Sequence, residues 1–452
     1  MAATGDKSWA AAEMWKHFRN IEKNSYLPVN TTGHGYKGYL DTMVVDSGWI
    51  NQKGGDGAEI FKQLAGVTGQ TGNVSELIYR DINKEGAGRD EELGFYGLAT
   101  HATKTTKRAG PAYYVKATLA DAKKYPLTLQ LNSLVTKVLF SNDSTPTAIG
   151  VEVLQGKSLY GADRRRKADV KGTATKIYAK KEVIIAGGAF NSPQILKLSG
   201  IGPADELKKF NIPVVKDLPG VGERLADNYE TSYIALAANK KPLTGVGAPV
   251  ALLLKTPTSP TKRRNIYAFC GAISFEGFWP GMPTEYGPSE FECAFVHMNP
   301  KSQAGYVRLR SADPTDTPDI NFRFFEHGGD QDLTELLDAV KTVRSAFEKV
   351  AAPVTPWDEV HPCKGTNAKC SDEAQKEFIK NQAYSHHPTS TCAIGPASDK
   401  WAVLDSKFRV HGVKNLRVVD ASAFPKIPGA FPVVPTMLLA EKATADILGT
   451  AV

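Results

Sequence analysis

The sequence has few cysteines and no long apolar run. Five cysteines in 452 residues are too few for a disulfide scaffold, although Cys363 and Cys370 bracket a short loop and could pair if the protein is exported. No apolar run approaches the roughly 20 residues of a membrane-spanning helix, so we expect no membrane span. The N-terminus lacks a basic start followed by an apolar core and does not read as a secretory signal. The cellular compartment stays open.

Charge and composition do not favour nucleic acid as a partner. The formal net charge is +7, and the densest basic run is Arg164-Arg165-Arg166-Lys167. No aromatic interleaving or nucleic-acid motif accompanies this run, so we expect it to form a solvated loop. The chain is long enough for two domains, and its 40 glycines and 27 prolines indicate a loop-rich enzyme rather than a helical bundle. We expect no metal site.

A strand, a glycine turn and a helix follow one another from residue 183 to residue 202. The β-branched run Val183 to Ile185 stops at Ala186-Gly187-Gly188, as a buried parallel strand does before a tight turn. Ser192 can cap the following helix, and Pro193 suits its first position. A strand end beside a helix N-terminus makes a site for an anion or for the polar edge of a cofactor.

The C-terminal part repeats this arrangement. Residues 416–419 are expected to form a buried strand that ends in Asp420-Ala421, and Pro435-Thr436 open an apolar helix that runs to Leu448. The strand end and the helix start would face one crevice. Before them lies the segment SHHPTSTCAIG, with the neighbouring histidines His386 and His387.

Both blocks closely resemble signatures of the glucose-methanol-choline (GMC) family of flavoprotein oxidoreductases. The first is KEVIIAGGAFNSPQILKLSGIGPADELKKFNIPVVKDLPGVGERLADN, and the second contains HPTSTCAIG and NLRVVDASAFPKIPGAFPVVPT. They stand in family order, and the resemblance runs over essentially the whole chain, most like the fungal branch. It implies an α/β (α+β) fold with an incomplete Rossmann-like FAD-binding domain and a substrate domain whose antiparallel sheet is backed by helices.

The resemblance implies an FAD-dependent oxidoreductase acting on the CH–OH group of an alcohol or sugar. A base removes the hydroxyl proton, hydride passes to flavin N5, and oxygen or a quinone-like acceptor takes the electrons. The motif places the base at His387, where an imidazole suits the task, with His386 as its neighbour on the substrate side. The expected FAD contacts are Val135, Ala186, Gly187, Gly188, Asn191, Asp420, Ala421, Pro435 and Thr436. Val135 could instead be core and Asp420 a cap.

The sequence departs from the family at two places. Phe431 occupies the position where the family presents a second histidine or an asparagine, and a phenyl ring cannot transfer a proton. It could form an apolar wall for a hydrophobic alcohol, or mark a non-redox lyase or cyclase on the same fold. In addition, no G-x-G-x-x-G follows a strand. We therefore expect the chain to lack the family's N-terminal FAD-binding segment, to bind FAD only with it, and otherwise to be an inactive fragment or one half of a split enzyme.

We divide the chain into four segments. Residues 1–85 form a cap on the substrate side, 86–235 part of the FAD-binding domain, 236–384 the substrate-binding domain and 385–452 the C-terminal part of the FAD-binding domain. The least recognisable segment, 236–384, contains aromatic residues that could line a hydrophobic cleft or be core: Phe275, Phe278, Trp279 and Tyr286. Alternating patterns predict strands at 127–131, 134–140, 148–154, 265–269, 292–297 and 305–309, and helices are expected at 108–120 and 332–350.

Overall fold

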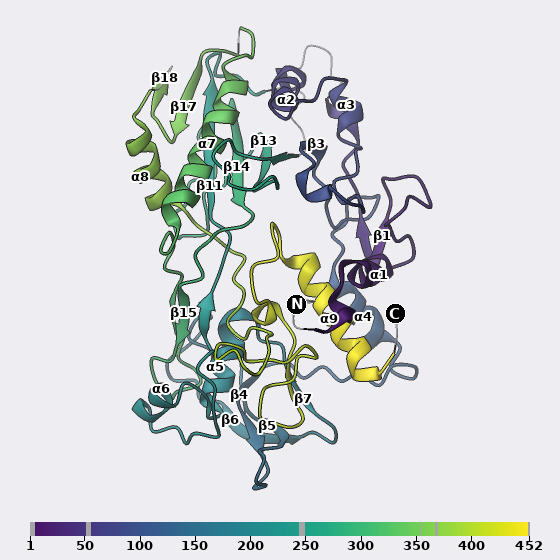
Figure 1. Ribbon diagram of the computed structural model, residues 1–452, viewed down its shortest axis with the longest axis vertical. Helices are drawn as coiled ribbons and strands as arrows, with labels where there is room; N and C mark the ends of the chain where they lie inside the picture. Colours follow the sequence, from purple (N-terminus) through teal and green to yellow (C-terminus); the bar gives the residue numbers. More distant parts are fainter. Residues whose placement is uncertain (1–4, 51–55, 244–248, 353, 367–368, 451–452) are drawn as a thin grey trace.

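The upper part of the molecule is built on a seven-stranded antiparallel sheet (Figure 1). The computed structural model describes residues 5–50, 56–243, 249–352, 354–366 and 369–450. In spatial order the strands are β18 (Gly365–Thr366), β17 (Trp357–His361), β11 (Glu230–Ala237), β14 (Glu290–His297), β13 (Ile266–Gly271), β12 (Val250–Leu254) and β3 (Gly94–Gly97).

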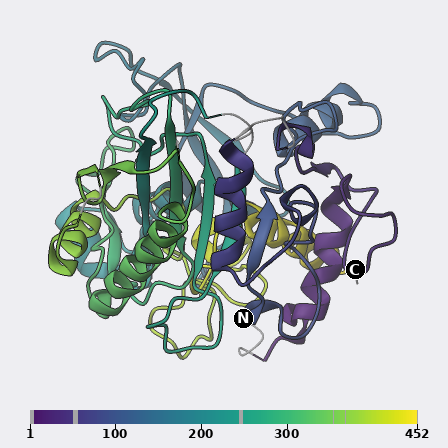
Figure 2. The ribbon, with the colours of Figure 1, turned by 90° about the horizontal axis from the view of Figure 1, so that it is seen from above.

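The two faces of this sheet bury different neighbours. Leu252 and Leu254 of β12 point into the main core, while Ala251 and Leu253 belong to a smaller cluster with Tyr267 on the opposite face, as the two-residue period of a strand requires. Helices α7 (Gly329–Phe347) and α8 (Asp372–Gln382) lie along the first face, as Figure 2 shows for the green helices. Helix α2 (Asp56–Val67) packs against α7.

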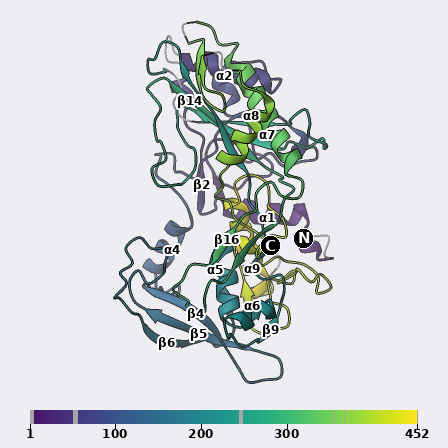
Figure 3. The ribbon, with the colours of Figure 1, turned by 90° about the vertical axis from the view of Figure 1, so that its left-hand side faces the viewer.

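The lower part contains a parallel strand pair and a separate three-stranded antiparallel sheet; the antiparallel sheet lies at the bottom of Figure 3. Strands β7 (Val183–Ile185) and β19 (Leu416–Val418) pair in parallel, and α5 (Gly188–Leu198) follows β7. The antiparallel sheet contains β4 (Ser133–Phe140), β5 (Ala148–Gln155) and β6 (Thr173–Tyr178). Helices α1 (Ala11–Ile21) and α9 (Val433–Leu448) pack together between the two parts.

The remaining helices and strands are short. They are β1 (Glu22–Asn24), β2 (Leu40–Thr42), α3 (Val74–Leu77), α4 (Pro111–Ala120), β8 (Ile201–Gly202), α6 (Ala204–Lys209), β9 (Lys216–Asp217), β10 (Glu223–Leu225), β15 (Gly305–Arg308) and β16 (Asp319–Asn321). This mixed architecture confirms the expected fold class. No helix in the described part of the chain is long and apolar enough to span a bilayer.

Several local expectations were wrong. Residues 127–131 form no strand, and Leu127, Leu129 and Leu131 are exposed, because an alternating pattern forms a strand only beside a partner. Helix α5 begins at Gly188, so Pro193 lies inside it and Ser192 does not cap it. Helix α9 begins two residues before Pro435.

The seven-stranded sheet crosses the segment boundaries expected from the sequence. Strands β3 and β11 lie within or across the end of 86–235, yet β3 pairs with β12 and β11 with β14. Local patterns show that a segment is a strand but not which sheet it joins. The four-segment division therefore remains a prediction. In the structure, strands from the segment 86–235 pair with strands from the segment 236–384.

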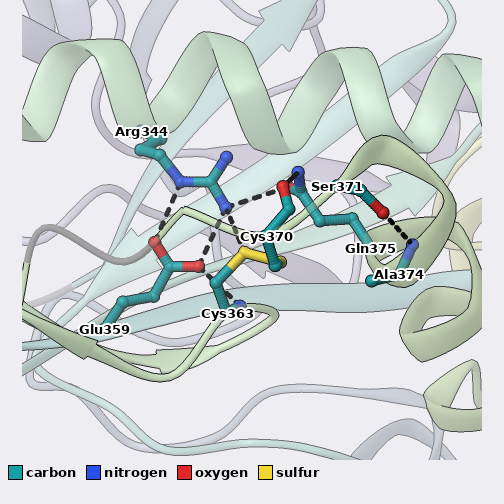
Figure 4. The surroundings of a disulfide bond; sticks show 7 residues. All are labelled: Arg344, Glu359, Cys363, Cys370, Ser371, Ala374 and Gln375. Atoms are coloured by element: carbon teal, nitrogen blue, oxygen red, sulfur yellow. Dashed lines mark hydrogen bonds and ion pairs between the residues drawn. A yellow bond between two sulfur atoms is a disulfide. The ribbon is translucent and has the colours of Figure 1, made fainter.

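Two disulfides lie in the upper part. Cys363 and Cys370 are joined, and Figure 4 shows Arg344 beside them, donating hydrogen bonds to Glu359 and Gln375. The second bond joins Cys270 and Cys293. The sequence reading missed it because these cysteines face each other only in the register of β13 and β14.

Candidate active site

His387 is buried, and its side chain lies beside a buried carboxylate. Its backbone N–H donates to Oδ1 of Asp227 at 2.8 Å. Its Nδ1 lies 3.1 Å from Oε1 of Glu230, the first residue of β11, and Nδ1 of His386 lies 3.2 Å from the same oxygen. The Glu230 side chain is completely buried. The structure thus joins the histidine pair to a carboxylate 156 residues earlier in the chain.

Burial controls the charge of these groups. It lowers the pKa of His387 to about 4 and lowers the pKa of His386 as well. It raises the pKa of Glu230 to about 7, although His386 acts in the opposite direction. Within the described residues, neither Glu230 oxygen nor His387 Nδ1 makes a hydrogen bond of good geometry. At neutral pH the His387 imidazole is uncharged and can accept a proton.

The same three side chains could also hold a metal ion. One ligand atom each from Glu230, His386 and His387 lies within 4.8 Å of the others, and this is the only such group among the described residues. Two imidazoles and a carboxylate are ligands that zinc accepts. The sequence had led us to expect no metal site.

Phe431 connects His387 to a cavity. Its ring meets His387 edge-on, with centroids 5.4 Å apart, and meets Tyr267 at 4.8 Å. Its φ of +53° is unusual for a residue with a bulky side chain. Phe431 and Pro435 line a cavity of about 420 Å³, to which α1 and β13 also contribute. His387 does not itself line this cavity, so Phe431 is the wall beside it.

His386 faces a different group of aromatic residues. Its side chain is about one-third exposed (32%), and its ring contacts Phe275 and Phe278. Neither His386 nor these two residues lines the Phe431 cavity. Trp279 is exposed, and the Tyr286 hydroxyl contacts Glu276 and His361.

Four of the residues expected to contact FAD line a second cavity, of about 440 Å³. These are Val135, Ala186, Gly187 and Asn191. Ala186 and Gly187 are exposed at the end of β7. Gly188 has φ +80°, and the direction that a Cβ would take there is open space. Gly187, the residue before helix α5, offers no side-chain cap, and the N–H of Gly188 at the start of the helix donates to the carboxylate of Asp420. These residues fit one side of a dinucleotide site.

Asp420 serves as a cap in the structure. Its Oδ2 accepts hydrogen bonds from the Gly188 N–H at 3.0 Å and the Ser192 hydroxyl at 2.5 Å, and its Oδ1 accepts one from the Ser422 N–H. The capping alternative therefore accounts for its carboxylate. Ala421 accepts a hydrogen bond from the Ser390 N–H at 3.2 Å, which places the histidine-bearing segment against the end of β19.

A threonine of the same segment completes α5. Pro193 has no N–H to donate to the carbonyl of Ala189, four residues earlier. The hydroxyl of Thr391 donates to that carbonyl instead, at 2.7 Å. Both the proline and the threonine belong to the quoted motifs, so the two motifs meet through this bond.

The last two residues expected to contact FAD lie on α9. Pro435 lines the Phe431 cavity rather than the cavity at β7. The Thr436 hydroxyl donates to the carbonyl of Pro432 within its own helix. Of the nine expected cofactor residues, four therefore line the cavity at β7 and one, Pro435, lines the Phe431 cavity, whereas Gly188, Asp420, Ala421 and Thr436 line neither.

Sequence reasoning missed Glu230 and Asp227. Glu230 lies two residues beyond the first quoted block, in the otherwise apolar or hydroxylic run ETSYIALA. Burying a single carboxylate at the start of such a strand is costly unless it has a partner. The isolated glutamate in this run was therefore the sequence feature that could have indicated a functional role for Glu230.

Comparison with known proteins decides the family. The models described as GMC oxidoreductase match residues 4–230 and 300–440. The chain belongs to the GMC oxidoreductase family. Because the first match begins at residue 4, the comparison does not show that the family's N-terminal segment is missing, and that expectation stays a prediction.

GMC relatives also appear among curated proteins and solved structures. The chain is 34% identical to the glucose methanol choline oxidoreductase atC of Aspergillus terreus and 36% identical to the mitochondrial choline dehydrogenase of Homo sapiens, over 71% and 80% of its own length. It spans only 55% and 59% of those proteins. The crystal structure of pyridoxine 4-oxidase from Mesorbium loti superposes with a TM-score of 0.74 at 21% identity, covering 99% of this chain and 79% of the other, which shows the shared fold.

Proposed function

We propose that this GMC protein carries out FAD-dependent oxidation of a CH–OH group, with His387 as the proton acceptor. The observation that carries the proposal is the buried, uncharged imidazole of His387 against Phe431, which lines the 420 Å³ cavity. A cavity of this size suits a small molecule. The human relative is named choline dehydrogenase, and choline is an alcohol.

The chain offers residues for FAD at both cavities. Val135, Ala186, Gly187, Gly188 and Asn191 would hold the dinucleotide side at β7 and α5, with Asp420 and Ala421 fixing the backbone there. Pro435 and Thr436 would lie nearer the ring. When bound, FAD supplies the hydride acceptor; any N-terminal segment of the family would add to its binding.

His387 would take the hydroxyl proton of the substrate. The negative charge of ionised Glu230, 3.1 Å from Nδ1 of His387, would favour the tautomer with the proton on Nδ1 and so leave the lone pair on Nε2 free to act as the base. Glu230 is thus a positioning residue. Phe431 would contact the apolar part of the substrate, and oxygen or a quinone-like molecule would be the final electron acceptor.

Flavin absorbance tests this proposal. The purified chain incubated with FAD should become yellow and should bleach on anaerobic addition of an alcohol substrate. His387→Gln should keep the colour and lose the bleaching, whereas His327→Gln, at an exposed histidine before α7, should behave like wild type. If the flavin of His387→Gln bleaches at the wild-type rate, His387 is not the base.

A second candidate, a non-redox lyase or cyclase, is favoured by one observation. Phe431 contacts His387 at the place where the resemblance implies a proton-transferring partner. Protein that is coloured but never bleaches with any alcohol would support this candidate. Protein that stays colourless would support an inactive fragment or half-enzyme.

A further inference from the structure

The Phe431 cavity contains a buried arginine without a partner. Arg264 lines the cavity two residues before β13 begins, and it is only 8% exposed. Its backbone N–H donates to the carbonyl of Asp90 at 2.8 Å. In the described part of the chain, its guanidinium makes no hydrogen bond and no ion pair. Buried charges in proteins are normally paired.

The charged groups near Arg264 do not neutralise it. Burial lowers the pKa of Arg264, and Arg89, which also lines the cavity, lowers it further. The nearest carboxylates act in the opposite direction but have other partners. Asp90, whose side chain is 56% exposed, lies 3.5 Å from Nη1 of Arg89, and Glu92 accepts a hydrogen bond from Arg80 at 3.2 Å.

The third carboxylate near this space is occupied as well. Glu22 lines the cavity, but its oxygens contact His34 and accept from the Gly35 N–H at 2.9 Å. The other walls are largely apolar and include the aromatic rings of Trp15, Phe18, Tyr267 and Phe431. A molecule that fits must therefore combine an apolar or aromatic body with a negative group.

We infer that this cavity binds a carboxylate-bearing small molecule whose carboxylate pairs with Arg264. A planar guanidinium binds a carboxylate through two parallel hydrogen bonds. If the proposed function holds, the substrate is then a hydroxy acid with an aromatic or apolar body. A cationic alcohol such as choline is disfavoured, because Arg264 and Arg89 would repel it.

Benzoate binding in the absence of FAD and of any turnover tests the inference. We expect benzoate to quench the fluorescence of Trp15, to bind saturably in calorimetry and to raise the melting temperature of the wild-type chain. Benzyl alcohol has the same ring without the charge and should bind at least about tenfold more weakly, since a hydrogen bond to a charged group contributes more than a factor of ten. Choline should not compete with benzoate.

Substitutions at two neighbouring arginines distinguish a specific contact with Arg264 from a general effect of positive charge on benzoate binding. Arg264→Met should weaken benzoate binding at least about tenfold, and Arg264→Lys should weaken it less. Arg263→Met removes the same charge from the adjacent exposed position and should leave binding unchanged. Arg264→Met should melt no lower than wild type, because it removes an unpaired buried cation.

Several outcomes would overturn the inference. Equal binding of benzyl alcohol and benzoate, or full benzoate binding by Arg264→Met, would show that no carboxylate pairs with Arg264. Tighter binding of inorganic phosphate than of benzoate would assign the site to another anion. The comparison of benzoate with benzyl alcohol needs only wild-type protein, so a variant that fails to fold does not prevent the test. If benzoate binds but no alcohol or hydroxy acid bleaches the flavin of the FAD-loaded protein, the proposed oxidation is refuted while the carboxylate site stands.

Discussion

The rings of Phe431 and His387 meet edge to face, with centroids 5.4 Å apart and planes at 90°. Phe431 also holds a left-handed backbone conformation, which asparagine adopts more readily than phenylalanine. The position is therefore compatible with the polar residue that the family resemblance implies, although the chain carries an apolar one.

Phe431→Asn should consequently improve turnover of small polar alcohols. The amide can hydrogen-bond the substrate oxygen, and we expect kcat/KM to rise about tenfold, less than the roughly hundredfold or more that a true proton-transferring group contributes. Phe431→Leu, which stays apolar, should show no gain. Steady-state kinetics with FAD present measure both variants, and a gain with leucine as large as that with asparagine would contradict the proton-handling explanation.

Glu230 should give the activity its pH dependence. Its pKa of about 7 means that the carboxylate forms as the pH rises through neutrality, and only the charged form would favour the Nδ1–H tautomer of His387, 3.1 Å away. We expect kcat/KM to rise with pH around 7. Glu230→Gln should lower it roughly tenfold to hundredfold at pH 8 and abolish that inflection.

Glu292→Gln is the matched control for Glu230→Gln. Glu292 is also buried in the large sheet, on β14, and burial raises its pKa well above the ordinary value. The shift favours the protonated form of Glu292, which a glutamine side chain resembles more closely than it resembles a carboxylate. A pH profile of Glu230→Gln that matches those of wild type and Glu292→Gln would exclude the positioning role.

His34 should make the fold less stable at alkaline pH. Burial opposes its charge, but hydrogen bonds to the carboxylates of Asp81 and Glu22 outweigh burial and raise the pKa of His34 to about 9. The resulting stabilisation is fully present below the unfolded-state pKa of about 6.5 and is lost as the pH rises through about 9. It amounts to something on the order of 3 kcal/mol.

Urea unfolding at pH 6 and pH 9.5 measures this loss. The free energy of unfolding of wild type should be lower at pH 9.5 than at pH 6. His34→Gln should be less stable than wild type at pH 6, and its free energy of unfolding should decrease much less between the two pH values. His411→Gln removes a half-buried histidine that contacts the Gly395 carbonyl. This variant should lose as much unfolding free energy between pH 6 and pH 9.5 as wild type does.

Removal of the two disulfides should lower the stability of the protein by different amounts. Cys363→Ser with Cys370→Ser opens a loop of sequence separation 7 and should destabilise by about 2 kcal/mol. Cys270→Ser with Cys293→Ser opens a separation of 23 and also places two hydroxyls in the fully buried core, so the loss should be larger. Thermal unfolding of both double variants compares them, and the reverse order would contradict this view.

The sequence predicted best those elements that local patterns control. The alternation in 134–140 and 148–154 corresponds to β4 and β5, and the apolar run before Asp420 corresponds to β19. Residues 127–131 share the alternation but have no partner strand. Local pattern was therefore sufficient only where the tertiary structure supplied a neighbour.

The candidate site was predictable only where a motif marks it. His387 and Phe431 were found through the family resemblance, and they do lie together. Glu230, Arg264 and the Cys270–Cys293 bond could not be found in this way, because each depends on strand register or on a cavity formed by distant segments. Asp420 shows the opposite case, since the capping alternative visible in the sequence accounts for its observed hydrogen bonds.

The hydroxyl of Thr391, bound to the carbonyl that Pro193 leaves free, ties the first turn of α5 to the stretch of chain that begins at His387. A displacement of α5 should therefore move the segment that begins at His387 directly, without help from solvent or ligand. Even a change as small as threonine to valine could thus misalign the imidazole while every residue around it keeps its identity.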